Sequence, residues 1–173
     1  MRLRGILAAA LIGAAMPALT LAPTPAAAVT AGPFWWASAS VSDSNRMVLD
    51  VQGPSTAQYA KIHLWSFHGG SSQYWYMDSA GSGSSTWLLR NKYSGKCMDR
   101  QGTGTANGTA VVQDTCDFGD KGQQWRQEFR YEGGGHQYYR FVNVLTGKCL
   151  DNAEGGITNG NKSKSGAAAL PTA

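Results

Sequence analysis

The apolar residues of this 173-residue chain fall in short runs that turns separate. Runs with the length and composition of β-strands occur, or begin, at residues 62–65, 75–77, 110–113 and 125–129. Glycine-rich turns are expected at residues 69–70, 81–83 and 133–135. No apolar period of 3.6 residues persists over three turns, as a helix would require. The pattern therefore predicts an all-β chain built from many short strands.

The first 28 residues have a different pattern, which is typical of an export signal. Arg2 and Arg4 precede an apolar stretch over residues 5–22, and three small residues follow at 26–28. A membrane anchor is the alternative, but the apolar run is short and prolines interrupt it. We therefore expect residues 1–28 to be a signal peptide. No later stretch is long and apolar enough to span a bilayer, so the exported chain is expected to be soluble.

Comparison of the sequence with itself shows a repeat. Residues 89–99 read LRNKYSGKCMD and residues 141–151 read FVNVLTGKCLD, and both end in an aspartate, Asp99 and Asp151. A more diverged copy contains Asp50, which precedes the other two aspartates by 49 and then a further 52 residues. The chain therefore contains a threefold repeat of roughly fifty residues, and neighbouring copies must share one core because a single copy cannot bury its own apolar face.

The first two copies each end in a Gln-x-Trp motif, at residues 73–75 and 123–125. With the repeated Gly-Lys-Cys-(Met/Leu)-Asp motif, this resembles the ricin-type lectin family of carbohydrate-binding modules. The resemblance spans about residues 34–162 and implies a β-trefoil of three pseudo-symmetric repeats. The domain is expected over residues 29–162, with repeats at about 34–82, 83–132 and 133–162.

The third copy matches the other two only as far as Lys162. Residues 163–173 contain no cysteine, no Gln-x-Trp motif and no apolar strand, and we expect this unmatched tail to be disordered. Three accounts of the truncated third repeat stay open: a change of reading frame, decay of a duplicated gene, or completion by a partner. The abruptness of the break favours the first.

The cysteines fit the same alignment. Cys97 and Cys116 are 19 residues apart, and the family resemblance implies a disulfide within the second repeat. The corresponding first-repeat residues, Val48 and Phe67, are both apolar, as a packed substitute for that disulfide would be. Cys149 occupies the first cysteine position of the third repeat and is expected to be unpaired.

The resemblance places a saccharide site in the first repeat. A sugar ring needs an aromatic face for its C–H side and carboxylate or amide groups for its hydroxyls. The matching residues are Asp50, His63, Trp65, Ser72 and Gln73. Two other interpretations stay open: Trp65 is core, or Asp50 binds backbone N–H groups in a turn.

The other two repeats depart from this set. The second repeat keeps Asp99 and Gln123, but Asp114 stands where the stacking ring belongs, so we expect a weak or silent site. The third repeat keeps Asp151, whereas its stacking position is Gly166, so we expect no site there.

Composition and charge restrict the remaining classes of function. The net charge is +4, and it falls to +2 without the two leader arginines, which is too weak and too scattered to indicate nucleic acid or a membrane surface. The 11 acidic residues offer no facing pair for glycoside hydrolysis, and the three scattered histidines offer no zinc pattern. We expect a secreted, extracellular lectin-like protein for a galactoside or xylan-type glycan, with no cofactor and no catalysis. The alternative is a sugar-inactive trefoil that binds a protein as a partner or inhibitor module.

Overall fold

The computed structural model describes residues 29–39, 43–81 and 85–166. The expected signal peptide and residues 167–173 lie outside this part, so neither expectation is tested. The described residues form the following strands: β1 (Thr30–Phe34), β2 (Met47–Val51), β3 (Ile62–Ser66), β4 (Trp75–Ser79), β5 (Thr86–Asn91), β6 (Cys97–Arg100), β7 (Val111–Asp114), β8 (Gln124–Gly133), β9 (His136–Asn143), β10 (Cys149–Asn152) and β11 (Asn161–Gly166). The described helices are the 3-10 turns η1 (Asp43–Asn45), η2 (Ser71–Gln73) and η3 (Ala153–Gly155). The prediction of an all-β chain is confirmed.

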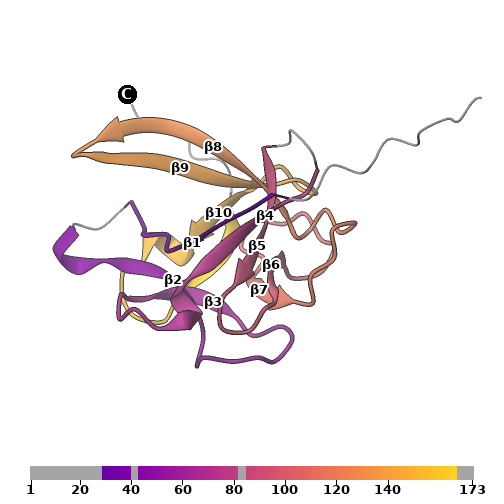
Figure 1. The fold of residues 1–173 in the computed structure, drawn as a ribbon, viewed down its shortest axis with the longest axis horizontal. Coiled ribbons are helices and arrows are strands. Elements are labelled where there is room, and N and C mark those ends of the chain that lie inside the picture. The colour runs from indigo at the N-terminus through magenta and orange to yellow at the C-terminus, as the bar shows by residue number, and fades with distance from the viewer. Residues whose placement is uncertain (1–28, 40–42, 82–84, 167–173) are drawn as a thin grey trace, which may run out of the picture.

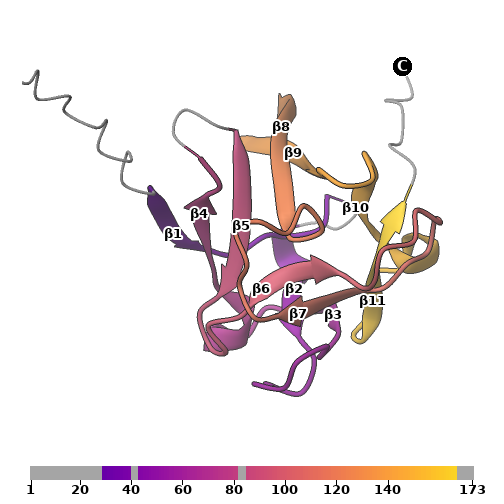
Figure 2. The ribbon, with the colours of Figure 1, turned by 90° about the vertical axis from the view of Figure 1, so that its right-hand side faces the viewer.

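The strands fall into two groups. Strands β1, β4, β5, β8 and β9 pair in that order, each antiparallel to the next. The other strands form three hairpins, one from each repeat: β2–β3, β6–β7 and β10–β11. In Figure 2, β4, β5 and β8 stand upright above β2, β3, β6 and β7. The long β8–β9 hairpin extends from the body of the molecule at the upper left of Figure 1.

The three hairpins share one register, which fixes the alignment of the repeats. Asp50 lies opposite His63, and at the same position of their hairpins Asp99 lies opposite Val112 and Asp151 opposite Lys164. Antiparallel register determines which face every side chain takes. Residues at one position of the repeat therefore occupy corresponding places in the three hairpins.

The expectation that the chain is disordered from residue 163 onward is wrong for residues 163–166. These residues belong to β11, which pairs with β10 through residues 163–166 and with β3 through residues 161–162. Their short sequence, Ser-Lys-Ser-Gly, lacks the apolar pattern of β3 and β7. Backbone hydrogen bonding to β10 holds it in place, and two small side chains, Ser163 and Ser165, are buried. Strand propensity gave no signal here because tertiary pairing overrides it.

The core lies between the two groups of strands. Its members include residues of all three repeats: Met47, Leu49, Val51, Ile62, Leu64, Trp75, Met77, Leu89, Met98, Val111, Trp125 and Phe141. The indole Nε1 of Trp75 donates to the carbonyl of Leu49 at 3.1 Å, and that of Trp125 donates to the carbonyl of Met98 at the same distance. Each indole therefore fills the core without leaving its N–H group unpaired, so the two Gln-x-Trp tryptophans serve packing.

The cysteines lie as the repeat alignment predicts. Cys97 and Cys116 form a disulfide with a Cα–Cα distance of 4.9 Å, and a loop of 19 residues closed in this way contributes about 3 kcal/mol. Cys149 is buried and free. In the first repeat, Val48 is buried, and the ring of Phe67 packs against the rings of Trp35 and Tyr74.

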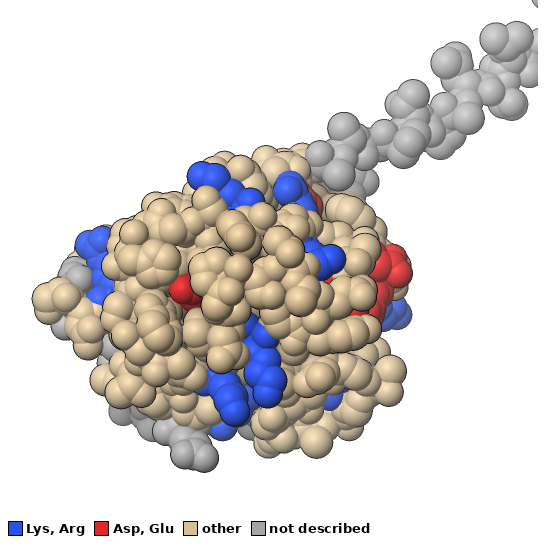
Figure 3. Space-filling view, turned by 90° about the horizontal axis from the view of Figure 1, so that it is seen from below, with Lys and Arg blue, Asp and Glu red and all other residues tan. Residues whose placement is uncertain are grey.

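No helix among the described residues is long and apolar enough to cross a membrane. Most of the face in Figure 3 is uncharged, and its basic side chains stand in separate groups. A continuous basic field, which polyanion binding requires, is not seen on that face.

Candidate functional site

Strands β2 and β3 bring three of the predicted site residues together in the first repeat. Asp50 on β2 faces His63 on β3, and Trp65 lies two residues further along β3, on the same side as His63. The rings of His63 and Trp65 stack, with centroids 5.2 Å apart and planes 24° apart. The side chain of Trp65 is 38% exposed, so the indole lies at the surface and not in the core.

A network of hydrogen bonds holds the Asp50 carboxylate. Its Oδ2 atom accepts from Nε2 of Gln73 at 3.2 Å and lies 3.4 Å from Nε2 of His68. Gln73 also donates to the carbonyl of Ser66 and accepts from the backbone N–H groups of His68 and Gly69. Gln73 therefore ties the loop after β3 to the carboxylate, and this loop places His68 over it. His68 is not among the residues predicted for the site, because its role depends on this loop.

The predicted site also contains several buried polar atoms without a protein partner. Oδ1 of Asp50, Nδ1 of His63 and Oγ of Ser72 are buried, and none has a hydrogen-bond partner within the described chain. Burial holds the pKa of His63 below its usual value, against the opposing charge of Asp50, so the imidazole is neutral at pH 7. An unpaired buried polar group costs about 1–3 kcal/mol, so three of them on the residues of one predicted site are unusual and need an explanation.

The second repeat has the same backbone and a different chemistry. Asp99 is buried, and its burial and the charges of Asp120 and Asp114 raise its pKa to about 7. Asp114 accepts a 2.6 Å hydrogen bond from Nε2 of Gln58. Gln123 accepts from the backbone N–H of Asp117 and donates to the backbone carbonyl of Thr115, and neither of these bonds involves Asp99. An acidic group therefore stands where the first repeat has an exposed ring.

The third repeat has no aromatic residue at the stacking position. Gly166 lies opposite Cys149, as Trp65 lies opposite Val48. A Cβ atom at Gly166 would lie only 2.6 Å from Oδ2 of Asp151, so a larger residue there would require the side chain of Asp151 to shift. The side chain of Asp151 is exposed, unlike its equivalents Asp50 and Asp99.

The described residues offer no alternative metal chemistry. They contain no group of three or more His, Cys, Asp or Glu residues that could hold a metal ion. The chemistry available at the first-repeat site is therefore hydrogen bonding by a carboxylate, an imidazole and a hydroxyl beside an aromatic face.

Sequence comparison identifies the family. The model of the "Ricin-type beta-trefoil lectin domain-like" family matches residues 39–114 and 84–165, which together cover well over half of the chain. The chain belongs to this family, and the predicted resemblance is confirmed. The second match extends through β11, in agreement with the pairing of that strand. No curated protein sequence matches the chain.

Solved structures agree on the fold. The designed threefold-symmetric protein ThreeFoil is 29% identical, with a TM-score of 0.65, over 75% of this chain and 87% of its own. An exo-β-1,3-galactanase from Clostridium thermocellum is 25% identical, with a TM-score of 0.61, over 75% of this chain and 28% of its own. A lectin from Polyporus squamosus, solved with a sialylated glycan epitope, is 18% identical, with a TM-score of 0.62, over 80% of this chain and 45% of its own.

Proposed function

We propose that this protein is a secreted lectin that binds a glycan through the first-repeat site and does not transform it. Membership of the ricin-type family supports carbohydrate binding as the general activity. The finer assignment is to Asp50, His63, Trp65, Ser72 and Gln73, with a galactoside or a xylan-type chain as ligand.

One observation carries this assignment: of the four buried polar atoms in the first repeat that lack a partner within the described chain, three lie on predicted site residues, Asp50, His63 and Ser72, and the fourth is Nε1 of Trp36. Sugar hydroxyls both donate and accept, so they can satisfy a carboxylate oxygen, an imidazole nitrogen and a hydroxyl together. The exposed face of Trp65 beside them suits the C–H side of a pyranose. In the described conformation His68 covers the carboxylate, so binding requires that this exposed side chain move aside.

The test is a comparison of two substitutions at the same position of the repeat. Trp65→Ala removes the stacking face and should weaken binding to immobilised galactan or xylan by tenfold or more, since the site loses both stacking and apolar burial. Asp114→Ala should leave binding unchanged. Circular dichroism of both variants verifies the fold. Equal binding by wild type and Trp65→Ala would contradict the proposed site.

A glycan array decides between this function and its alternative. A folded protein that binds no glycan on repeated arrays would favour a trefoil that binds protein and has lost its sugar sites. The observation that favours this alternative is that the second and third repeats have no aromatic residue at the stacking position.

The proposed export depends on residues 1–28. A disulfide in the second repeat supports it, because such bonds persist in oxidising compartments. Expression of the full chain in a secreting host should yield a product that begins near residue 29. N-terminal sequencing of the protein purified from the culture medium would detect this cleavage.

A further inference from the structure

A segment of the third repeat borders the first-repeat site. Strand β3 lies between β2 and β11, and Lys162 on β11 lies opposite His63. The backbone N–H of Gly160, just before this pairing, donates to the carbonyl of Leu64 at 2.9 Å. The residues predicted for the site all belong to the first repeat, because the repeat pattern does not show which strand of another repeat lies beside β3.

Hydrogen bonds hold this segment against the exposed tryptophan of the site. Oδ1 of Asn159 accepts from the backbone N–H of Ser66 at 2.7 Å and from the hydroxyl of the same residue at 2.9 Å. A Cβ atom at Gly160 would lie 4.0 Å from Cζ3 of Trp65, so the backbone of the segment runs along the edge of the indole. Residues 159–162 therefore form one border of the site.

Three side chains of different chemistry form a row across these strands. Directly opposite residues of antiparallel strands project from the same face of a sheet, so Asp50, His63 and Lys162 share one face. Trp65, two residues after His63, projects from that face as well. Neighbouring strands are about 4.8 Å apart, so the backbones of Asp50 and Lys162 are about 10 Å apart. A sugar ring on Trp65 therefore has a carboxylate towards β2 and an ammonium group towards β11.

The charge of Lys162 has no opposite charge to neutralise it in the described part of the chain. The side chain is exposed, and none of the ion pairs among the described residues includes it. Asp50, the acid in the same row, already accepts from Gln73 and lies beside His68. The ammonium group of Lys162, on its flexible four-carbon stem, is therefore available to a ligand on this face.

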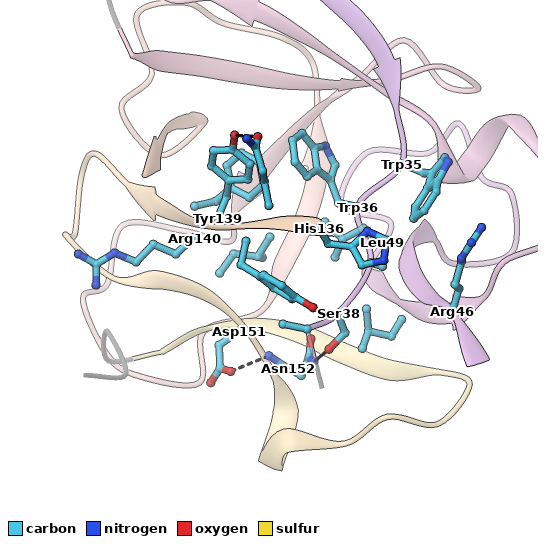
Figure 4. Close-up of a pocket in the computed structure, with 17 residues that line it drawn as sticks. Trp35, Trp36, Ser38, Arg46, Leu49, His136, Tyr139, Arg140, Asp151 and Asn152 are labelled. Carbon is cyan, nitrogen blue, oxygen red and sulfur yellow. Dashed lines mark hydrogen bonds between the residues drawn. The ribbon is translucent and has the colours of Figure 1, made fainter. Parts of the chain in front are cut away.

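The other lysine of β11 has different surroundings. Lys164 lies opposite Asp151, so it has an acidic neighbour on β10. Asp151 lines a cavity of about 450 Å³ beside β9, and it accepts from the backbone N–H of Asn152 at 2.8 Å (Figure 4). The position that corresponds to Trp65 in this hairpin is Gly166. Of the two lysines, Lys162 is thus the one that lies beside a stacking ring.

We propose that Lys162 makes the first-repeat site selective for acidic saccharides, whose carboxylate pairs with its ammonium group. The inference rests on the proposed function, because it concerns the ligand of the same site. A carboxylate and an ammonium group form a charge-assisted hydrogen bond, which is stronger than the bond that a neutral hydroxyl forms. Asp50 repels an acid at the other side, so the two charges also orient the ligand. Among galactoside and xylan-type chains, this favours those that carry a uronic acid.

The test compares each probe with its own neutral form. The probes are a xylo-oligosaccharide with a glucuronic acid side group and an oligogalacturonate, each before and after reduction of its carboxyl groups to alcohols. Isothermal titration calorimetry at low ionic strength should show that the protein binds the acidic form of its ligand about twofold to fivefold more tightly than the reduced form. The preference should disappear in about 0.5 M salt, because added ions screen an exposed pair. Equal affinity for the two forms would overturn the proposal and leave the proposed function standing.

Variants separate the charge of Lys162 from the rest of the site. Lys162→Gln should lose the preference for the acidic form and bind the reduced form as the wild type does, whereas Lys162→Arg should keep the preference. Lys121→Gln removes the same charge from an exposed position of the second repeat and should change neither affinity.

Two further outcomes decide against the proposal in different ways. If Lys162→Gln weakens binding of both forms equally, the lysine contacts neutral hydroxyls, and the inference fails while the proposed function stands. If the folded wild type binds neither form of either probe, and no glycan on the array, both proposals fail together.

Discussion

The first and second repeats place an aspartate at the same register position, but the first surrounds it with hydrogen-bonding neutral or basic groups and the second with acidic groups. Asp50 accepts a hydrogen bond from Gln73 and lies beside His68. Asp99 is buried near Asp114 and Asp120, and its pKa rises to about 7. The backbone pairing of the two hairpins is the same, so neighbouring side chains produce the whole difference.

The decisive position lies 15 residues after each aspartate. In the first repeat it holds a ring, which adds no charge and presents a flat face at the surface. In the second it holds Asp114, whose charge opposes ionisation of Asp99 and whose carboxylate is bonded to Gln58 from the first repeat. Asp114 therefore adds to the effects of burial and of Asp120, which are the larger causes of the raised pKa of Asp99. Two repeats with the same backbone pairing therefore differ in the side chains that they offer to a ligand.

The largest difference between the two repeats should appear on removal of the disulfide. Replacing Cys97 and Cys116 together by alanine should lower the free energy of unfolding by about 2–4 kcal/mol, because the unfolded chain regains the entropy of a 19-residue loop. Urea unfolding measures this loss. Glycan binding at the first-repeat site should persist wherever the variant is folded. A loss below 1 kcal/mol would mean that the second repeat, like the first, is held by packing alone.

A smaller effect, and one that depends on pH, is expected for Asp99→Asn. The pKa of Asp99 is raised to about 7 by burial first and then by the charges of Asp120 and Asp114. The unfolded chain therefore releases this proton near pH 4 and the folded chain near pH 7, so the wild type loses stability as pH rises between these values. The variant should be more stable than the wild type by about 1–3 kcal/mol at pH 8 and equal to it near pH 3.

Thermal or urea unfolding across this pH range tests the prediction. Asp151→Asn is the matched control, because Asp151 stands at the same position of the repeat and its side chain is exposed. A constant difference between wild type and Asp99→Asn at all pH values would contradict the electrostatic cause.

The smallest expected effect concerns His68, which has no counterpart in the sequence-based site. His68→Ala removes the exposed side chain that lies 3.4 Å from Oδ2 of Asp50. A pair of this kind is worth about 0.5–1 kcal/mol, so freeing the carboxylate should tighten glycan binding by about twofold to fivefold. Isothermal titration calorimetry with a soluble oligosaccharide measures the change. Weaker binding by the variant would make His68 a contact for the ligand rather than a cover.

The repeats and their strands were predictable from the sequence for a local reason. The Gly-Lys-Cys-(Met/Leu)-Asp and Gln-x-Trp motifs combine turn residues with core residues at fixed spacing, and this spacing determines the hairpins, the disulfide and the burial of Trp75 and Trp125. The same spacing placed Asp50, His63 and Trp65 on neighbouring strands.

Other features depend on contacts between segments far apart in the chain, and only the tertiary structure decided them. Residues 163–166 form a strand because β10 and β3 offer paired backbone edges, although their side chains carry no strand pattern. His68 covers Asp50 because Gln73 binds the loop that carries it. The cavity beside β9 is lined by residues 35–39 and 136–141, which lie about a hundred residues apart in the sequence, so only the tertiary structure brings them together.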